Sequence, residues 1–367
     1  MKIFRVSRGI AERAPLLPGA FPLFLALAAL VFTSGCSPAT DRTDRLFSAV
    51  PTRYYESVEI SDIETAERLL GLAPVDHRSP LEDKLDFFTK IGRFSFSMAE
   101  LSYLLGEEAP LGFDPGDFSA RALARTESFA VTVVLGDFHR TEIVENLTHA
   151  GFESTEHRGH VVYSLPWSEA ITMGGLPLSF SNLVFLDEDI IAHAPTRRLL
   201  MDYLDRLEIR TLAGDEDIAA IIDRVEKDGS YTALFIGSSI TMTSMYDEEE
   251  RLFIREPGDW GFPEYRLHPY TYYAFAVRPK RVEDDILQDI TLIVYYQDET
   301  SPQEDRELLT RGLTEGLSVS RQTPFRDLFR VEEVDVTGRM LTARMYAVDD
   351  FDIEVLIRLK DLPFLVY

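Results

Sequence analysis

Residues 128–151 read SFAVTVVLGDFHRTEIVENLTHAG, and this stretch indicates the fold class. Its first eight residues are rich in valine and other apolar side chains, which is typical of a buried strand. Gly136-Asp137 breaks the strand, and Thr141–Ala150 then places its apolar residues at the spacing of a helix face. Gly151 ends this helix, because glycine is common just past a helix end. Two short strands flanking Arg158-Gly159 follow, so the order is strand, helix and hairpin.

The C-terminal half repeats this order with different residues. Leu292–Tyr296 is a predicted strand, Gln303–Glu315 is a predicted helix, and two strands flank Thr337-Gly338 as a hairpin. Ser301-Pro302-Gln303-Glu304 begins the helix, with proline at the first helical position. The repeated order predicts two related βαββ units. The predicted fold class is therefore α+β, with mostly antiparallel sheets and helices packed on one face.

The chain begins with the parts of a secretory signal. Four basic residues lie between Lys2 and Arg13, and Phe21–Phe32 is an uncharged apolar run. This run is about a dozen residues long, which is too short for a bilayer core that requires roughly 20. We therefore expect residues 1–35 to be a signal peptide rather than a transmembrane helix.

A lipid attachment site follows the apolar run. Thr33-Ser34-Gly35-Cys36 resembles the lipobox of bacterial lipoproteins, in which small residues precede a cysteine. The resemblance implies that the Cys36 thiolate receives a diacylglycerol and becomes an acylated, palmitate-bearing first residue. Several acyl chains hold a protein stably at a membrane, so the membrane is the expected partner of Cys36. Ser37, in place of aspartate, indicates the outer membrane in a bacterium that has two. The alternatives are an ordinary cleaved signal with a chance cysteine, or an uncleaved anchor.

Cleavage before Cys36 would leave 332 of the 367 residues. It would remove four of 37 basic and one of 62 acidic residues, leaving 33 and 61 and a net charge of −28. So negative a body disfavours nucleic acid, which requires a basic surface. Cys36 is the one cysteine, so the mature body has no disulfide or thiolate metal site. We expect residues 36–53 to be a polar tether, followed by α+β units over 54–210 and 211–367.

A succession of short motifs carries a second resemblance. In chain order these are GFDPGDF at Gly112–Phe118, VLGDF at Val134–Phe138, AGF at Ala150–Phe152 and HRGHVVY at His157–Tyr163. The succession resembles a group of uncharacterised bacterial lipoproteins and exported proteins, close in style to an exported domain family of unknown function. Leu292–Tyr346 is similar to the second half of that group, so the resemblance covers most of residues 54–346. It implies the fold class and the exported address, and no activity or site residue.

The sequence contains no nucleophile elbow, phosphate loop, dinucleotide fingerprint or zinc-binding helix motif. No cofactor, metal or catalytic residue is therefore predicted. Gly237-Ser238-Ser239 follows a strand and could present a serine, but the missing second glycine favours a plain strand end. His157 and His160 flank a predicted turn and would point differently, which favours structural roles. His193 and His268 have no spacing partners.

Acidic runs raise two further hypotheses, a calcium site and a carboxylate pair for hydrolysis. The runs are Asp187-Glu188-Asp189, Asp247–Glu250 and Asp349–Glu354, and none has the spacing of a calcium-binding helix-loop-helix motif. Solvated turns are the favoured interpretation. With 61 acids in the mature chain, the sequence does not select the two carboxylates that glycoside hydrolysis requires.

The candidate binding patch is an aromatic segment before and within a predicted strand. Its members are Trp260, Tyr265, Tyr270, Tyr272 and Tyr273. Aromatic rings with a polar end are favoured where a surface meets a partner or a sugar. The alternative is that the strand from Tyr272 packs alternate rings into the core beneath a covering loop.

Three functions remain open from the sequence. The first is a non-catalytic envelope lipoprotein that binds an unidentified envelope protein or ligand. The second is a membrane-tethered hydrolase with an unrecognised carboxylate site, and the third is a purely structural envelope component. The missing enzyme motifs favour binding or structure over catalysis. A deep pocket with two carboxylates of raised pKa would favour the enzyme, and an exposed aromatic patch near Tyr270 would favour binding.

Overall fold

The computed structural model divides the chain into two units, Met1–Asp41 and Arg42–Tyr367. The second unit contains all the strands of the described chain, and its fold is given below. The residues whose structure is described are 38–52, 55–96, 111–126, 130–166, 180–239, 265–283, 285–318, 320–348, 351–359, 361–362 and 365.

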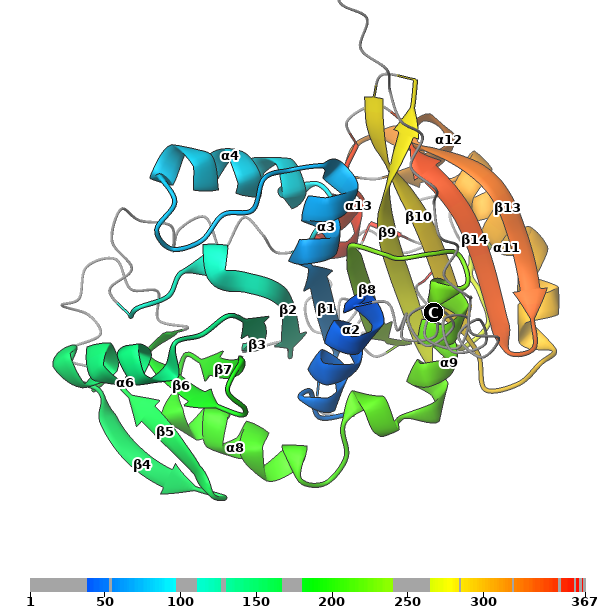
Figure 1. Ribbon diagram of the computed structural model, residues 1–367. Helices are drawn as coiled ribbons and strands as arrows, with labels where there is room; N and C mark the ends of the chain where they lie inside the picture. The colour runs from blue at the N-terminus through cyan, green and yellow to red at the C-terminus, as the bar shows by residue number, and fades with distance from the viewer. Residues whose placement is uncertain are drawn as a thin grey trace, which may run out of the picture. The chain divides into compact units, whose positions relative to one another are not determined.

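Within these residues, twelve strands form one sheet in which every neighbouring pair is antiparallel (Figure 1). Their order across the sheet is β13-β14-β10-β9-β8-β1-β2-β3-β7-β6-β5-β4. The strands are β1 (Ser57–Asp62), β2 (Phe118–Arg125), β3 (Ala130–Gly136), β4 (Glu153–His157), β5 (His160–Ser164), β6 (Asn182–Phe185), β7 (Ile190–Ala194), β8 (Ala233–Ser238), β9 (Tyr272–Val282), β10 (Asp285–Tyr295), β13 (Phe329–Thr337) and β14 (Met340–Ala347). A separate small hairpin pairs β11 (Leu317–Ser318) with β12 (Thr323–Pro324).

Helices connect and cover these strands, and the α+β fold class is confirmed. The α-helices are α2 (Pro38–Ser48), α3 (Ile63–Leu70), α4 (Leu81–Gly92), α6 (Arg140–His149), α8 (Arg197–Leu207), α9 (Glu216–Glu226), α11 (Ser301–Glu315), α12 (Phe325–Leu328) and α13 (Ile353–Arg358). Two 3-10 turns, η1 (Pro115–Asp117) and η3 (Leu212–Gly214), precede β2 and α9.

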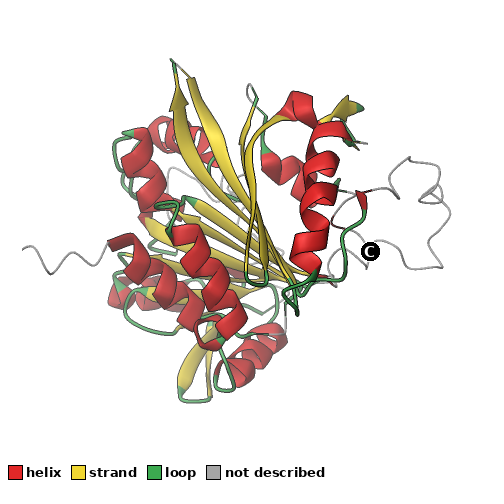
Figure 2. Cartoon of the chain, turned by 90° about the vertical axis from the view of Figure 1, so that its right-hand side faces the viewer, coloured by secondary structure: helices red, strands yellow, loops and turns green. Residues whose placement is uncertain are grey.

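Helices cover both faces of the sheet, which corrects the prediction that they pack on one face (Figure 2). Ala274 and Ala276 of β9 lie in the core shared with α2, α8 and α9. The alternating residues Tyr273 and Phe275 lie in the opposite core, with α11 and α13. Helices α3, α4 and α6 cover the remainder of that second face. Because successive side chains of a strand point to opposite faces, a strand that is apolar throughout requires cover on both sides.

The strand order is the same on either side of the central β1–β8 pair. Outward from β1 the strands are β2, β3, β7 and β6, and outward from β8 they are β9, β10, β14 and β13. The β1–β8 pairing joins the predicted units 54–210 and 211–367 into one sheet. The hairpin that neighbours β3 is β6–β7, rather than the β4–β5 hairpin that the repeated order predicts. A common origin of the two halves stays a prediction.

Local signals place several elements as expected. Gly71 ends α3 in the left-handed conformation with φ 68°, and Pro302 lies in the first turn of α11. The predicted hairpin at Thr337-Gly338 is β13–β14. The spacing of Ser61 and Glu64 predicts a capping box that begins a helix, but the N-cap of α3 is Asp62, whose carboxylate accepts the Thr65 N–H at 2.9 Å. The sequence also predicts a helix at Met98–Leu105, which lies outside the described residues.

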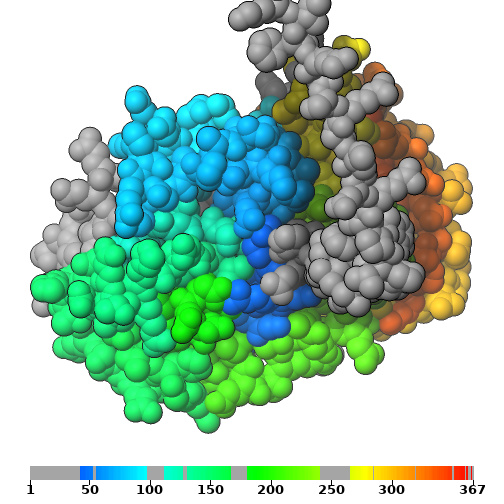
Figure 3. Space-filling model, in the orientation of Figure 1, coloured from blue at the N-terminus to red at the C-terminus, as the bar shows by residue number. Residues whose placement is uncertain are grey.

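The predicted polar tether is wrong for most of its length, because α2 folds there and packs into the core. Leu46 and Phe47 are buried against the sheet with α8. Arg42 forms an ion pair with Asp62, and Arg45 forms one with Asp189 in the β6–β7 turn. Figure 3 shows α2 in dark blue between the lighter blue of α3 and α4 and the green of α8 and α9. The compact body therefore begins at Arg42, well before the expected Tyr54.

Candidate functional site

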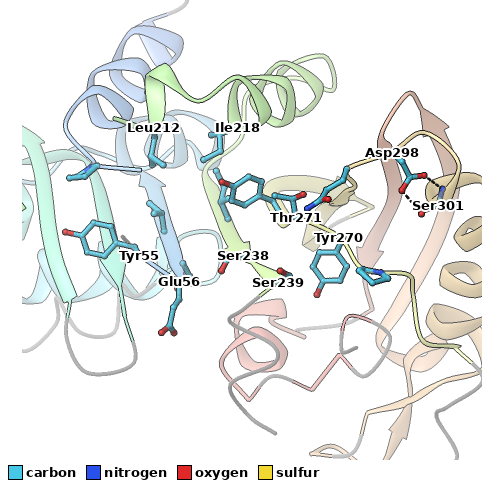
Figure 4. Close-up of a pocket in the computed structure, with 17 residues that line it drawn as sticks. Tyr55, Glu56, Leu212, Ile218, Ser238, Ser239, Tyr270, Thr271, Asp298 and Ser301 are labelled. Carbon is cyan, nitrogen blue, oxygen red and sulfur yellow. Dashed lines mark hydrogen bonds between the residues drawn. The ribbon is translucent and has the colours of Figure 1, made fainter. Parts of the chain in front are cut away.

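A cavity of about 620 Å³ opens at one edge of the sheet, where edge means the side along which strands begin and end and not an outermost strand. Strands β8 and β10 end there, and β1 and β9 begin there (Figure 4). Helix α9 with the preceding η3, and the first residue of α11, complete its wall. The described lining residues are Pro51, Tyr55, Glu56, Ser57, Val58, Leu212, Ile218, Ile236, Ser238, Ser239, Pro269, Tyr270, Thr271, Tyr272, Gln297, Asp298 and Ser301.

One wall of the cavity is apolar. Val58 of β1 and Ile236 of β8 are register partners, and both are buried. Leu212 of η3 and Ile218 of α9 face the same space in Figure 4. The position of Ile218 follows from the start of α9, since the Asp215 side chain accepts the backbone N–H of Asp217 and Ile218. This wall would contact the hydrocarbon part of a ligand.

The strand ends form a polar wall that backbone hydrogen bonds hold in place. The Ser238 N–H donates to the Glu56 carbonyl at 2.9 Å, and the Ser239 N–H donates to the Thr271 carbonyl at 3.2 Å. The Thr271 N–H in turn donates to the Tyr295 carbonyl at 2.8 Å. Figure 4 shows Ser238 and Ser239 between Glu56 on one side and Tyr270 on the other. Hydroxyl and carboxylate groups therefore lie opposite the apolar wall.

Asp298 places a negative charge on the side of the cavity opposite Glu56 (Figure 4). Its carboxylate accepts the Thr300 and Ser301 N–H groups at 2.8 Å each, and the Ser301 hydroxyl at 2.9 Å. Hydrogen bonds from the Ser301 N–H, the Ser301 hydroxyl and the Thr300 N–H lower the pKa of Asp298 below its ordinary value. The side chain is therefore ionised at neutral pH while it accepts N–H groups at the start of α11.

The structure places the predicted aromatic patch differently from the prediction. Tyr270 and Tyr273 are 3% and 1% exposed, so neither belongs to an exposed patch. Their rings lie 6.2 Å apart in an edge arrangement, and the Tyr270 hydroxyl donates to the Leu365 carbonyl. Tyr272 is half-buried and, with Tyr270, lines the cavity. Tyr265 lies beside Arg311, and Trp260 lies outside the described residues.

The Gly237-Ser238-Ser239 motif is a strand end with a packing requirement. A Cβ on Gly237 would lie 2.4 Å from the Tyr273 ring, so glycine is required for that ring to pack against β8. Ser238 and Ser239 line the cavity, and a serine hydroxyl can both donate and accept a hydrogen bond.

A histidine and a buried carboxylate meet beside the cavity, next to Pro269. His268 Nδ1 lies 2.7 Å from Asp305 Oδ1, and the His268 N–H donates to Asp305 Oδ2 at 2.7 Å. The Tyr296 hydroxyl also donates to Oδ2, at 2.8 Å. The hydrogen bond to Asp305, which is fully buried, and its charge raise the pKa of His268. Sequence spacing could not find this pair, because 37 residues separate the partners.

The other candidate groups have structural partners. His157 and His160 are register partners across the β4–β5 turn, and His157 Nε2 lies 3.0 Å from Asp205. Asp187 and Asp189 contact Arg45. Asp352 caps α13, whereas Asp247–Glu250 and Asp349-Asp350 lie outside the described residues. Among the described residues, no group of three histidine, aspartate or glutamate side chains could hold a metal ion.

Neither a family model, nor a curated protein, nor a solved structure matches this chain. None of the helices within the described ranges is both long enough and apolar enough to span a bilayer.

Proposed function

We propose that this chain is a lipid-anchored envelope protein that binds a small ligand without catalysis. The observation that carries the ligand-binding part is the cavity of about 620 Å³. Ligand sites are clefts of roughly 300–1,000 Å³ with apolar walls and a few placed polar groups. The wall of Val58, Leu212 and Ile218 faces hydroxyls and a carboxylate here, so both requirements are met.

The anchor and address rest on the N-terminal sequence. A basic start, a short apolar run and small residues before Cys36 support cleavage and acylation at that residue. Acyl chains would hold at the envelope a body whose net charge of −28 is repelled by anionic headgroups. The outer membrane is the proposed location in a bacterium with two membranes, as Ser37 favours.

The lipid and the ligand can be tested in separate experiments. Labelled palmitate should enter the wild-type protein and fail to enter Cys36→Ser. Native mass spectrometry of full-length protein, purified from its own membranes, should show a bound small molecule. Ser239→Trp should lose it, because a large ring would fill the polar side of the cavity.

Thr155→Trp is the matched control, since Thr155 is equally half-buried but lies on β4, away from the cavity. This control should keep the small molecule. Equal occupancy in wild type, Ser239→Trp and Thr155→Trp, or none in any of them, would reject the cavity as the binding site.

A membrane-tethered hydrolase is the second candidate, and the His268–Asp305 pair is the observation that favours it. The buried Asp305 holds Nδ1, as a carboxylate does in enzymes that use histidine as a general base, and Nε2 lies 3.5 Å from Glu304 Oε2. His268 is 47% exposed, so water can reach it. Hydrolysis of nitrophenyl esters or glycosides by wild type, lost in His268→Gln, would support the enzyme. Turnover that His268→Gln does not change would exclude this site.

A further inference from the structure

We propose that the cavity takes an organic cation with an apolar body, such as an alkyl- or arylammonium compound. This inference rests on the proposed ligand-binding function and names the chemical class of the ligand. Its first support is the charge of the lining. The described lining includes two carboxylates, Glu56 and Asp298. The Asp298 carboxylate would repel an anionic ligand and attract a cation.

The charge on Asp298 is available to a ligand. Its described hydrogen bonds come from neutral donors, the Thr300 and Ser301 N–H groups and the Ser301 hydroxyl. Neutral donors stabilise an ionised carboxylate but leave its negative charge in place. The nearby His268 lowers the same pKa to a lesser degree, but that ring is already held by the buried Asp305.

The apolar and aromatic walls fit the rest of such a molecule. Figure 4 shows Tyr55 and Glu56 on one side of the cavity, with Leu212 and Ile218 above and Asp298 on the opposite side. An alkyl or aryl body would bury its surface against the leucine and isoleucine. The ammonium group could then lie near the Asp298 carboxylate, which attracts a cation.

The charge of the whole body acts in the same direction. With a net charge of −28 after cleavage, the protein attracts cations over a longer range than any one side chain does. This contribution weakens with added salt, whereas burial of the apolar body does not. Affinity for a cation should therefore fall with ionic strength, and affinity for a neutral analogue should stay nearly constant.

Three probes that share a phenylalkyl body and differ in their head group separate these contributions: 4-phenylbutyltrimethylammonium, 4-phenylbutanol and 4-phenylbutanoate. Isothermal titration of each into the full-length protein, at low and at physiological salt, should give the tightest binding for the ammonium. We expect at least a tenfold advantage over the alcohol at low salt, and a smaller one at physiological salt. The carboxylate should bind most weakly.

Asp298→Asn tests the proposed contact while it preserves the fold, because an asparagine oxygen can accept the same Thr300 and Ser301 N–H groups. Affinity for the ammonium should fall several-fold, and affinity for the alcohol should not change. Asp335→Asn removes an exposed carboxylate on β13, distant from the lining, and should change neither affinity.

Carboxylate binding as tight as ammonium binding would overturn the ligand class, as would equal ammonium losses in Asp298→Asn and Asp335→Asn. The proposal that the cavity is the binding site would survive these outcomes, provided that Ser239→Trp still abolishes binding of all three probes. If Ser239→Trp leaves probe binding unchanged, the proposed function fails together with the ligand class.

Discussion

The two edges along which the strands begin and end have the same strand order, one outward from β1 and the other outward from β8. Side chains fill the first edge, whereas the second contains the cavity. At the first, β1 ends, β2 begins and β3 ends; at the second, β8 ends, β9 begins and β10 ends. Four phenylalanines fill the first edge, with ring centroids 5.6–6.2 Å apart: Phe113, Phe118, Phe138 and Phe180. The cavity occupies the second edge.

The helices that precede the central strands differ in the same way. Helix α2, before β1, directs Arg42 to Asp62 at the end of that strand and to Glu64 in α3. Helix α9, before β8, contributes Ile218 to the cavity wall. Similar strand arrangements therefore permit either a packed edge or a cavity. The side chains at the strand ends decide which one forms, and substitutions there can test the difference.

The largest expected effect is at the filled edge. Phe138→Ala should destabilise the protein by about 4 kcal/mol, because it removes a buried ring and leaves a void between Phe113 and Phe118. Tyr272→Ala at the open edge should cost about 1–2 kcal/mol, since this ring already borders the cavity. Urea unfolding measures both values. Equal losses would mean that the two edges are equally packed.

The second effect separates a buried ion pair from an exposed one on the same helix. Arg42 and Asp62 are 11% and 2% exposed, so Arg42→Gln leaves a buried carboxylate unpaired and should cost about 3 kcal/mol. Arg45 contacts Asp189, which is 38% exposed, and Arg45→Gln should cost less than about 1 kcal/mol.

The pH dependence of the Arg42→Gln cost sharpens this test. Burial already raises the pKa of Asp62, and Arg42 opposes that rise. Removing Arg42 should raise this pKa further. A raised carboxyl pKa favours the folded state at low pH, and this contribution is lost as pH rises through the folded value. The Arg42→Gln cost should therefore shrink toward pH 4, and a cost that grows there would contradict the assignment.

The third effect concerns the glycine beside the open edge. Gly237→Ala would bring a methyl group within 2.4 Å of the buried Tyr273 ring and should cost about 2 kcal/mol. Gly92→Ala is the control, because nothing lies within 4 Å of its Cβ position at the end of α4. It should be neutral or stabilising by up to about 1 kcal/mol. Thermal unfolding followed by circular dichroism distinguishes the two outcomes.

The smallest effect tests the pair beside the cavity. Asp305 raises the pKa of His268, so their interaction stabilises the fold below the ordinary histidine pKa and is lost as pH rises through the raised value. His268 is 47% exposed, so His268→Gln should cost below about 1 kcal/mol at pH 5.5 and less at pH 9. Tyr296→Phe removes another donor to Asp305 and should cost the same at both pH values. If His268→Gln lowered the free energy of unfolding more at pH 9 than at pH 5.5, the result would contradict a stabilising interaction between protonated His268 and Asp305.

Sequence patterns predicted much of the fold but little of the cavity. The strands that contain Tyr272 and Leu292 and the turn at Thr337-Gly338 could be predicted, because alternation, proline and glycine act locally. Tyr270 and Tyr272 were selected as aromatic residues, and both line the cavity, although Tyr270 is buried. Glu56, Leu212 and Asp298 were missed. They lie far apart in the chain, and no spacing rule relates them.

By itself, the sequence determined the α+β class, the placement of most strands and the strongly acidic body, because each follows from residue type and local spacing. It also predicts the lipid at Cys36, on the same local grounds. Only the tertiary structure decided that α2 packs into the core and that helices cover both faces. It alone also left one edge of the sheet open. These outcomes depend on long-range pairing, above all of β1 with β8, which positions residues that no local signal relates.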